Sequence, residues 1–168
     1  MPLAQSEFNQ LVSEHGDALY RTAYRLMGDA HDAEDIVQET FRSVWKSRER
    51  YERDRGDRAW LLSILRRRAV DRWRRRDSTE RTGGDELSLL AVRGEDPIED
   101  QYTDEVQAAL GQLHDDLRET LLLVVVGELT HQETADLLGI PIGTVLSRVS
   151  RARRQLRELL QAGQKHAV

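Results

Sequence analysis

Residues 77–103 show no helical or strand-like spacing of apolar side chains, although such spacing is clear on both sides of them. Glycines, Pro97 and acidic residues accumulate within this segment. A segment of this composition buries too little apolar surface to fold alone, and its like charges repel one another. We therefore predict a flexible acidic linker between two domains, residues 1–76 and residues 104–168.

The apolar residues before the linker recur at helical spacing and predict a bundle of amphipathic helices. Gly28-Asp29 would end the first helix, and the stretch around Gly56 would separate the second helix from the third. The expected core positions are Phe8, Leu11, Val12, Leu19, Ala23, Leu26, Val37, Phe41, Val44, Leu61, Leu65, Ala69 and Trp73.

The second domain contains one ambiguous element, the apolar run at residues 121–126. Its three valines favour a strand locally. Helical patterns lie on both sides of the run, and a lone strand would have no partner, so we expect a helix. The predicted fold class is all-α, with two small helical domains joined by a flexible acidic linker.

Charge is strongly segregated along the 168-residue chain, whose formal net charge is only -5. Residues 48–76 hold 12 basic and 5 acidic side chains, and residues 117–168 hold 7 and 5. Residues 77–116, which lie between these segments, have a net charge of -10. This pattern is expected if an acidic connector joins two DNA-facing modules.

The composition also excludes several classes of protein. The chain has no cysteine, which excludes disulfides and thiolate metal sites. Its longest apolar run is far shorter than the roughly 20 residues that span a bilayer, and the N-terminus has no secretory signal. We expect a cytoplasmic protein with no membrane insertion.

A helix-turn-helix motif is predicted in the second domain. Thr130 and Glu133 have the spacing of a capping box at a helix start. Gly139 would form the turn, and a second helix is expected over residues 142–160. The apolar stripe of that helix consists of Val145, Val149, Ala152 and Leu156.

The opposite face of the second helix is polar and basic. Its residues are Ser147, Ser150, Arg151 and Arg154. Arginine contacts phosphates and pairs bidentately with guanine, so this face suits the major groove of DNA. A solvated basic surface helix is the alternative interpretation of the arginines alone.

The segment LTHQETADLLGIPIGTVLSRVSRARRQLRELL resembles region 4 of the extracytoplasmic-function (group IV) sigma factors. The resemblance implies that the second helix recognises the minus-35 promoter element and that the domain docks on the flap of the polymerase beta subunit. It implies DNA contacts from Thr144, Ser147, Arg148, Arg151 and Arg154. Two residues depart from the family pattern: His114 replaces a usual proline, and Leu146 stands where lysine is common.

The segment DAEDIVQETFRSVW resembles region 2.2 of the same family, which binds the clamp helices of the polymerase beta-prime subunit. If Val37, Phe41 and Val44 point inward, the outer face carries the residues expected to bind polymerase. These are Asp35, Gln38, Glu39 and Arg42, with Lys46 beside them. A face of this kind is also common on a merely solvated helix.

The segment RAWLLSILRRRAVDRWRRR resembles regions 2.3 and 2.4, which melt and read the minus-10 element. One helical face carries Trp60, Ser63, Arg67, Asp71 and Arg74. An indole beside guanidinium groups can stack on unpaired bases and hold the backbone, as single-strand binding requires. Arg67 replaces the usual asparagine here, and Asp57 replaces a common aromatic residue.

Two small polar clusters could be taken for catalytic or metal sites. They are His31 with Asp35 and Glu39, and the run His114-Asp115-Asp116. No second ligand set, phosphate loop or nucleophile-base pair supports either cluster. We expect no metal, no cofactor and no enzyme activity.

The resulting hypothesis is a sigma factor that binds core RNA polymerase and directs it to promoter DNA by recognising the minus-35 and minus-10 elements. The resemblance also implies an anti-sigma factor as a partner. The alternatives are a stand-alone helix-turn-helix transcriptional regulator, which would bind duplex DNA unaided, and an adaptor that binds only proteins.

Overall fold

The computed structural model describes residues 2–52, 56–81 and 102–166. The chain divides into two compact units, Met1–Asp96 and Pro97–Val168, and each is described by itself. In the described ranges all regular secondary structure is helical. The all-α prediction with two helical domains is confirmed, whereas most of the expected linker lies outside the described residues.

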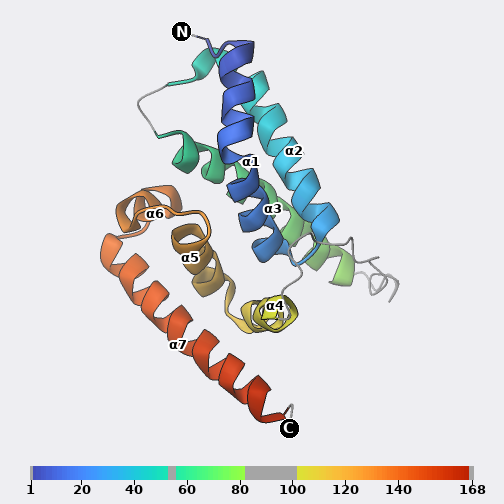
Figure 1. The fold of residues 1–168 in the computed structure, drawn as a ribbon, viewed down its shortest axis with the longest axis vertical. Coiled ribbons are helices and arrows are strands. Elements are labelled where there is room, and N and C mark those ends of the chain that lie inside the picture. Colours follow the sequence, from blue (N-terminus) through green and yellow to red (C-terminus); the bar gives the residue numbers. More distant parts are fainter. Residues whose placement is uncertain (1, 53–55, 82–101, 167–168) are drawn as a thin grey trace. The chain divides into compact units, whose positions relative to one another are not determined.

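Unit 1 is built from α1 (Gln5–Met27), α2 (Ala30–Lys46), the short 3-10 helix η1 (Arg48–Arg50) and α3 (Asp57–Arg81). Figure 1 shows α1 and α2 side by side with α3 packed against them. Gly28 ends α1 as predicted: its φ of 72° is left-handed, and its amide donates to the Tyr24 carbonyl at 2.7 Å. The Asp29 carboxylate then caps α2 by accepting from the Asp32 amide at 2.9 Å.

The core of unit 1 differs from the sequence prediction on α2. Val37 is only half-buried, whereas Ile36 and Thr40 are fully buried. A threonine can occupy this core because its hydroxyl donates to the Ile36 carbonyl at 2.7 Å and leaves no polar group unsatisfied. The expectation that Val37 points inward is therefore wrong by one position on the helix. Val12 of α1, also expected in the core, is exposed.

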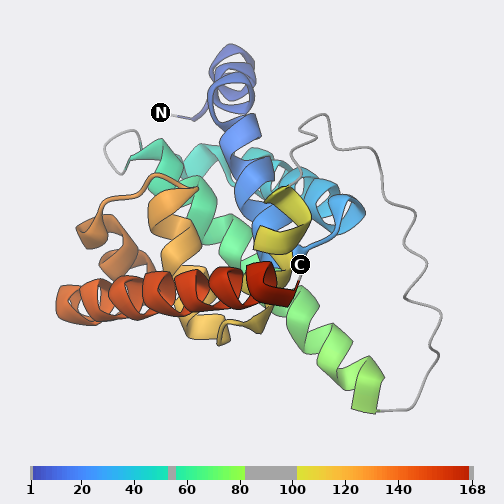
Figure 2. The same ribbon diagram turned by 60° about the horizontal axis from the view of Figure 1, so that its bottom comes forward.

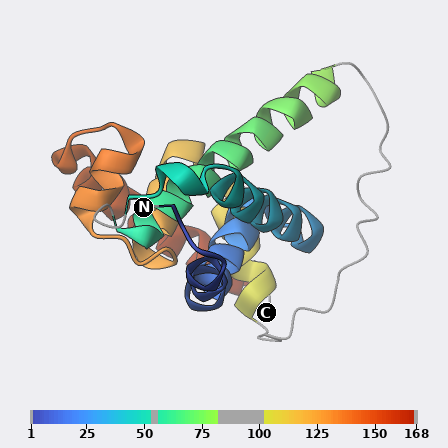
Figure 3. The same ribbon diagram turned by 90° about the horizontal axis from the view of Figure 1, so that it is seen from above.

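Helix α3 continues to Arg81 and so enters the segment that was expected to be linker. Figures 2 and 3 show its last turns extending beyond α1 and α2. Over residues 57–76, whose side chains the structure describes, the buried residues of α3 are Leu61, Leu62, Leu65 and Ala69.

Unit 2 contains α4 (Tyr102–Gln112), α5 (Asp115–Val125), α6 (His131–Leu138) and α7 (Ile142–His166), and α7 packs against the other three. The ambiguous run at residues 121–126 is helical through Val125, with Leu121, Leu122 and Leu123 buried. The prediction of a helix there is confirmed. No helix in residues 2–52, 56–81 and 102–166 is long and apolar enough to cross a bilayer.

Candidate nucleic-acid and polymerase interfaces

The helix-turn-helix of unit 2 has the predicted local geometry. The Thr130 hydroxyl accepts from the Glu133 amide at 3.0 Å, and the Glu133 carboxylate accepts from the Thr130 amide at 3.4 Å. Gly139 has a left-handed φ of 67°, and the amide of Ile140 donates back to the Ala135 carbonyl at 3.1 Å. These bonds fix the start of α6 and the turn that leads to α7.

Helix α7 buries one stripe and exposes a basic one. Val145 and Ala152 are completely buried. The predicted DNA-facing residues Ser147, Ser150, Arg151 and Arg154 are all exposed. Neither arginine has an ion pair within the part of the chain that the structure describes. Their guanidinium donors are therefore available to a ligand.

Two further residues expected to contact DNA, Thr144 and Arg148, are half-buried instead. Arg148 lies with one guanidinium nitrogen 3.8 Å from the Asp116 carboxylate of α5. Nearby, the His114 imidazole caps α5 by accepting from the Asp116 amide at 3.3 Å, so the replacement of proline at 114 falls on a helix cap. Arg148 thus lies beside the start of α5.

The start of α3 is more constrained than its sequence suggested. Trp60 is half-buried, and its ring packs on Tyr51 with 5.4 Å between centroids. The Ser63 hydroxyl is occupied, because it donates to the Trp60 carbonyl at 2.6 Å. The Tyr51 hydroxyl donates to Asp57, the position where the resembled family has an aromatic residue. Tyr51 supplies an aromatic ring at this place.

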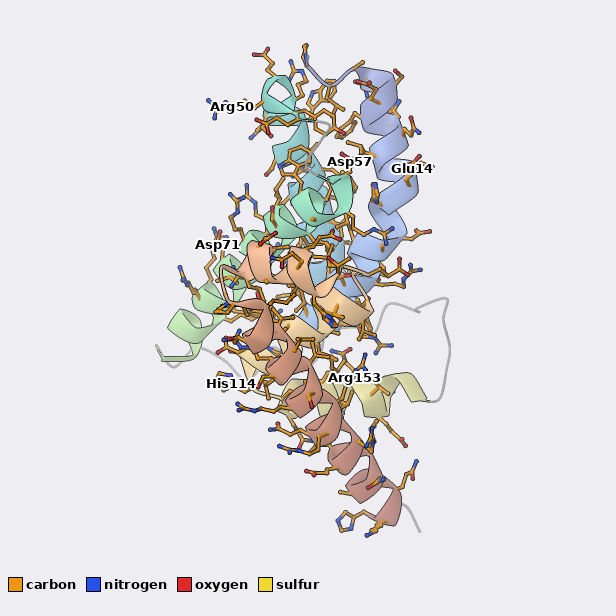
Figure 4. All side chains as sticks on the ribbon, turned by 90° about the vertical axis from the view of Figure 1, so that its left-hand side faces the viewer. Glu14, Arg50, Asp57, Asp71, His114 and Arg153 are labelled. Carbon is orange, nitrogen blue, oxygen red and sulfur yellow. The ribbon has the colours of Figure 1, made fainter. Side chains whose placement is uncertain are left out.

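The rest of the predicted α3 face is open. Arg67, Asp71 and Arg74 are exposed, and Figure 4 labels Asp71 on the outer side of the helix. The structure therefore brings these three side chains to one surface, with the packed indole of Trp60 about two to four turns earlier on the same helix.

The candidate polymerase face of α2 has a feature that sequence reasoning missed. Asp35, Gln38 and Arg42 are exposed as expected, and Glu39 is half-exposed. The guanidinium of Arg72 on α3 contacts three carboxylates of α2. Its nitrogens lie 2.6 Å from Asp32, 3.3 Å from Asp35 and 3.5 Å from Glu39.

Two other arginines of α3 also reach α2. Arg76 pairs with Asp32, and Arg68 donates to the Ser43 hydroxyl at 2.7 Å. Arginines 68, 72 and 76 are spaced by four residues, so they form one stripe along α3. That spacing was the available signal, but it does not say which helix the stripe faces.

Members of both clusters considered for metal or catalysis take part in contacts of the fold: Asp35 and Glu39 lie beside Arg72, and the His114 imidazole caps α5. Among the side chains that the structure describes, no group of three or more His, Asp or Glu residues is arranged to hold a metal ion. His15 of α1 is half-buried. Burial lowers the pKa of His15 from 6.5, and Arg58 lowers it further, while Asp57 and Glu14 act in the opposite direction.

Two family descriptions match the chain in the expected order. Residues 11–79 match sigma-70 region 2, and residues 103–156 match sigma-70 region 4. Among similar proteins, the chain is 37% identical to the ECF RNA polymerase sigma factor SigE of Mycolicibacterium smegmatis, covering 94% of this chain and 63% of SigE. It thus spans less than two thirds of that relative's length. It is 32% identical to the sigma factor CnrH of Cupriavidus metallidurans, covering 94% of this chain and 88% of CnrH.

Solved structures agree with these relatives. The sigma factor RpoE of Bartonella quintana, in complex with the anti-sigma factor NepR, superposes with a TM-score of 0.79 at 29% identity, over 93% of this chain and 98% of RpoE. CnrH in complex with the cytosolic domain of CnrY gives 0.69 at 31% identity, over 95% of this chain and 90% of CnrH. The chain belongs to the sigma-70 family and, within it, to the extracytoplasmic-function sigma factors.

Proposed function

We propose that this chain binds core RNA polymerase and directs it to promoters by reading the minus-35 element with α7 and the opened minus-10 strand with α3. The observation that supports this most strongly is the exposed Ser147, Arg151 and Arg154 face on the second helix of a capped helix-turn-helix, in a region that matches sigma-70 region 4. An arginine on such a helix can donate two hydrogen bonds to the edge of a guanine in the major groove.

Polymerase would contact the chain through α2. Asp35, Gln38 and Arg42 are exposed, and Glu39 is half-exposed, so a partner can reach all four. The carboxylates suit a basic surface such as the beta-prime clamp helices, and unit 2 would dock separately on the beta flap. Because Arg72 already contacts Asp35 and Glu39, a basic partner would share these carboxylates with it.

Single-stranded DNA would lie along α3. Arg67 and Arg74 are exposed and can hold phosphates, while the Trp60 ring, braced by Tyr51, offers an aromatic surface for a base. The Ser63 hydroxyl is bonded to its own helix, so a DNA contact from it would need that bond to open. Asp71 would sit among these groups as an acceptor.

In this role the chain is not an enzyme, since the polymerase carries the chemistry, and it needs no cofactor. It would act in the cytoplasm, where polymerase works. The complexes of RpoE with NepR and of CnrH with CnrY support an anti-sigma factor as a further partner of this chain.

A DNA-binding experiment with and without core polymerase tests the proposal. A randomised promoter library is incubated with the purified chain, with core polymerase, or with both, and bound sequences are determined. We expect enrichment of one bipartite sequence only when both proteins are present. Enrichment by the chain alone would favour the stand-alone helix-turn-helix regulator, and no enrichment in any sample would favour a protein-binding adaptor.

A further inference from the structure

Two large aliphatic side chains are exposed at the start of α7. Ile142 is 44% exposed and Leu146 is 49% exposed. They are four residues apart, so they lie on the same side of the helix, one turn from each other. Of the four exposed large hydrophobic residues among the described residues, these two are adjacent on the helix that carries the candidate DNA face. A pair of this kind differs from the scattered single residues that are normal on protein surfaces.

The surroundings of Leu146 are cationic. Leu146 and Val149 line a shallow groove between α6 and α7 together with His131, Arg153 and Arg157. Arg153 and Arg157 are exposed, and Figure 4 labels Arg153 on α7. A ligand for this surface should therefore carry negative charge beside a small apolar group. Duplex DNA satisfies both conditions, because phosphates flank the major groove and the C5-methyl group of thymine lies on its floor.

We propose that Leu146, supported by Ile142, contacts a thymine methyl group in the minus-35 element and so requires a T·A pair at one position of the promoter. This inference rests on the proposed function of α7. A leucine has no hydrogen-bonding group, so it can discriminate bases only through apolar contact. The C5-methyl of thymine is the apolar group that a base pair presents in the major groove. Arg153 and Arg157 would hold the adjacent backbone.

Replacing thymine by uracil removes only the methyl group and therefore tests the contact directly. A promoter is first selected from a minus-35 library with the holoenzyme, and each thymine on either strand is then replaced singly by uracil. We expect a loss of affinity of about three- to fivefold at one position, which corresponds to burial of one methyl group. Leu146→Ala holoenzyme should show no loss at that position, while keeping the other base preferences.

Val125→Ala is the matched control, because Val125 is an aliphatic residue of the same unit with a similar exposure of 51%. This variant should retain the full uracil sensitivity. The inference is overturned if the selected minus-35 element contains no required T·A pair, if uracil is tolerated everywhere, or if Leu146→Ala remains equally sensitive. It is also overturned if Leu146→Ala loses affinity for core polymerase, which would assign the pair to a protein interface. Absence of any selected promoter would instead contradict the proposed function itself.

Discussion

The arginines of α3 and of α7 differ in what surrounds them, although both helices are strongly basic. On α3 the stripe of Arg68, Arg72 and Arg76 faces α2 and is occupied by its hydroxyl and carboxylate groups. On α7 Arg151 and Arg154 are exposed and have no ion pair within the described residues. The same residue type therefore contributes to helix packing in the stripe of α3 that faces α2, and remains available for a ligand at Arg151 and Arg154 of α7, as it does at the exposed Arg67 and Arg74 of α3.

The difference follows from the neighbouring helix. Helix α2 places Asp32, Asp35 and Glu39 beside α3, and Arg72 is only 22% exposed where it meets Asp32, itself 18% exposed. A partly buried guanidinium with several carboxylate partners is part of the packing between helices. Counting arginines on a helix is thus a poor guide to its DNA-binding face, and their partners have to be known.

The largest expected effect is a loss of transcription when an unpaired arginine of α7 is removed. Arg151→Ala should weaken transcription from promoters with an intact minus-35 element by about 1 to 3 kcal/mol, or roughly 5- to 150-fold, if the contact with a base is bidentate. Transcription in vitro from matched promoters with intact and scrambled minus-35 elements measures it. A uniform loss on both templates would indicate a phosphate contact, and full activity would move the reading face elsewhere on α7.

Replacing Arg72 should have a smaller effect, and this effect should be on the stability of unit 1 and not on DNA binding. Arg72→Ala removes a charge-assisted hydrogen bond to Asp32 and leaves neighbouring carboxylates without their common cation. We expect the free energy of unfolding of unit 1 to fall by about 1 to 2 kcal/mol. Urea denaturation of the purified chain measures it.

Arg67→Ala is the control for Arg72, because Arg67 lies on the same helix but is exposed. Its cost should stay below about 0.5 kcal/mol. Equal losses for the two variants would show that the contacts of Arg72 with α2 contribute nothing to stability, and the contrast between the helices would disappear.

Changes on the candidate polymerase face of α2 should have a weaker effect, which is a loss of affinity for core polymerase. Removing the charges of Asp35 and Glu39 with Asp35→Asn and Glu39→Gln should reduce affinity for core polymerase about fivefold, because each exposed ion pair contributes up to about 1 kcal/mol. Amides are preferable to lysines here, since a lysine would face Arg72. Competition binding to core polymerase measures the change.

Glu34→Gln serves as the control, because Glu34 is exposed on the same helix but turned by about 100° from Asp35. It should leave polymerase affinity unchanged. If the double variant binds as tightly as the native chain, the assignment of this face to polymerase is wrong.

The smallest expected effect is on the pH dependence of the stability of unit 1. Because the pKa of His15 is below 6.5 in the folded chain, the unfolded chain binds more protons between the folded pKa and 6.5. Stability should therefore decrease as pH falls through that window. His15→Gln should flatten this slope in denaturation measured at several pH values, and an unchanged slope would show that His15 is not its source.

The sequence was a good guide wherever a local signal decides the structure. Gly28, Gly139 and the Thr130 capping box end or begin helices through bonds within a few residues of themselves. The exposed face of α7 also followed from helical spacing around Val145 and Val149. Such features depend on backbone geometry and need no knowledge of which helices meet.

What the sequence could not supply are contacts between helices. The three-carboxylate environment of Arg72 joins residues 33 to 40 positions apart, and the bracing of Trp60 by Tyr51 crosses a helix start. Arg148, which the family resemblance expects to contact DNA, lies beside Asp116 of α5, a neighbour that the sequence does not indicate. Thr40 is a different case, because the bond that lets it take a core position lies within α2: its hydroxyl donates to the Ile36 carbonyl, which hydrophobic patterning does not anticipate.

The central claim, that α7 reads duplex DNA and α3 reads the opened strand, is tested most directly by holoenzyme affinity for two probes. One probe is a duplex with the minus-35 element, and the other is a single strand with the minus-10 element. Arg151→Ala should weaken binding to the duplex alone, whereas the Arg67→Ala/Arg74→Ala double variant should weaken binding to the single strand alone. If each variant weakens both probes equally, the division of labour between α7 and α3 is contradicted.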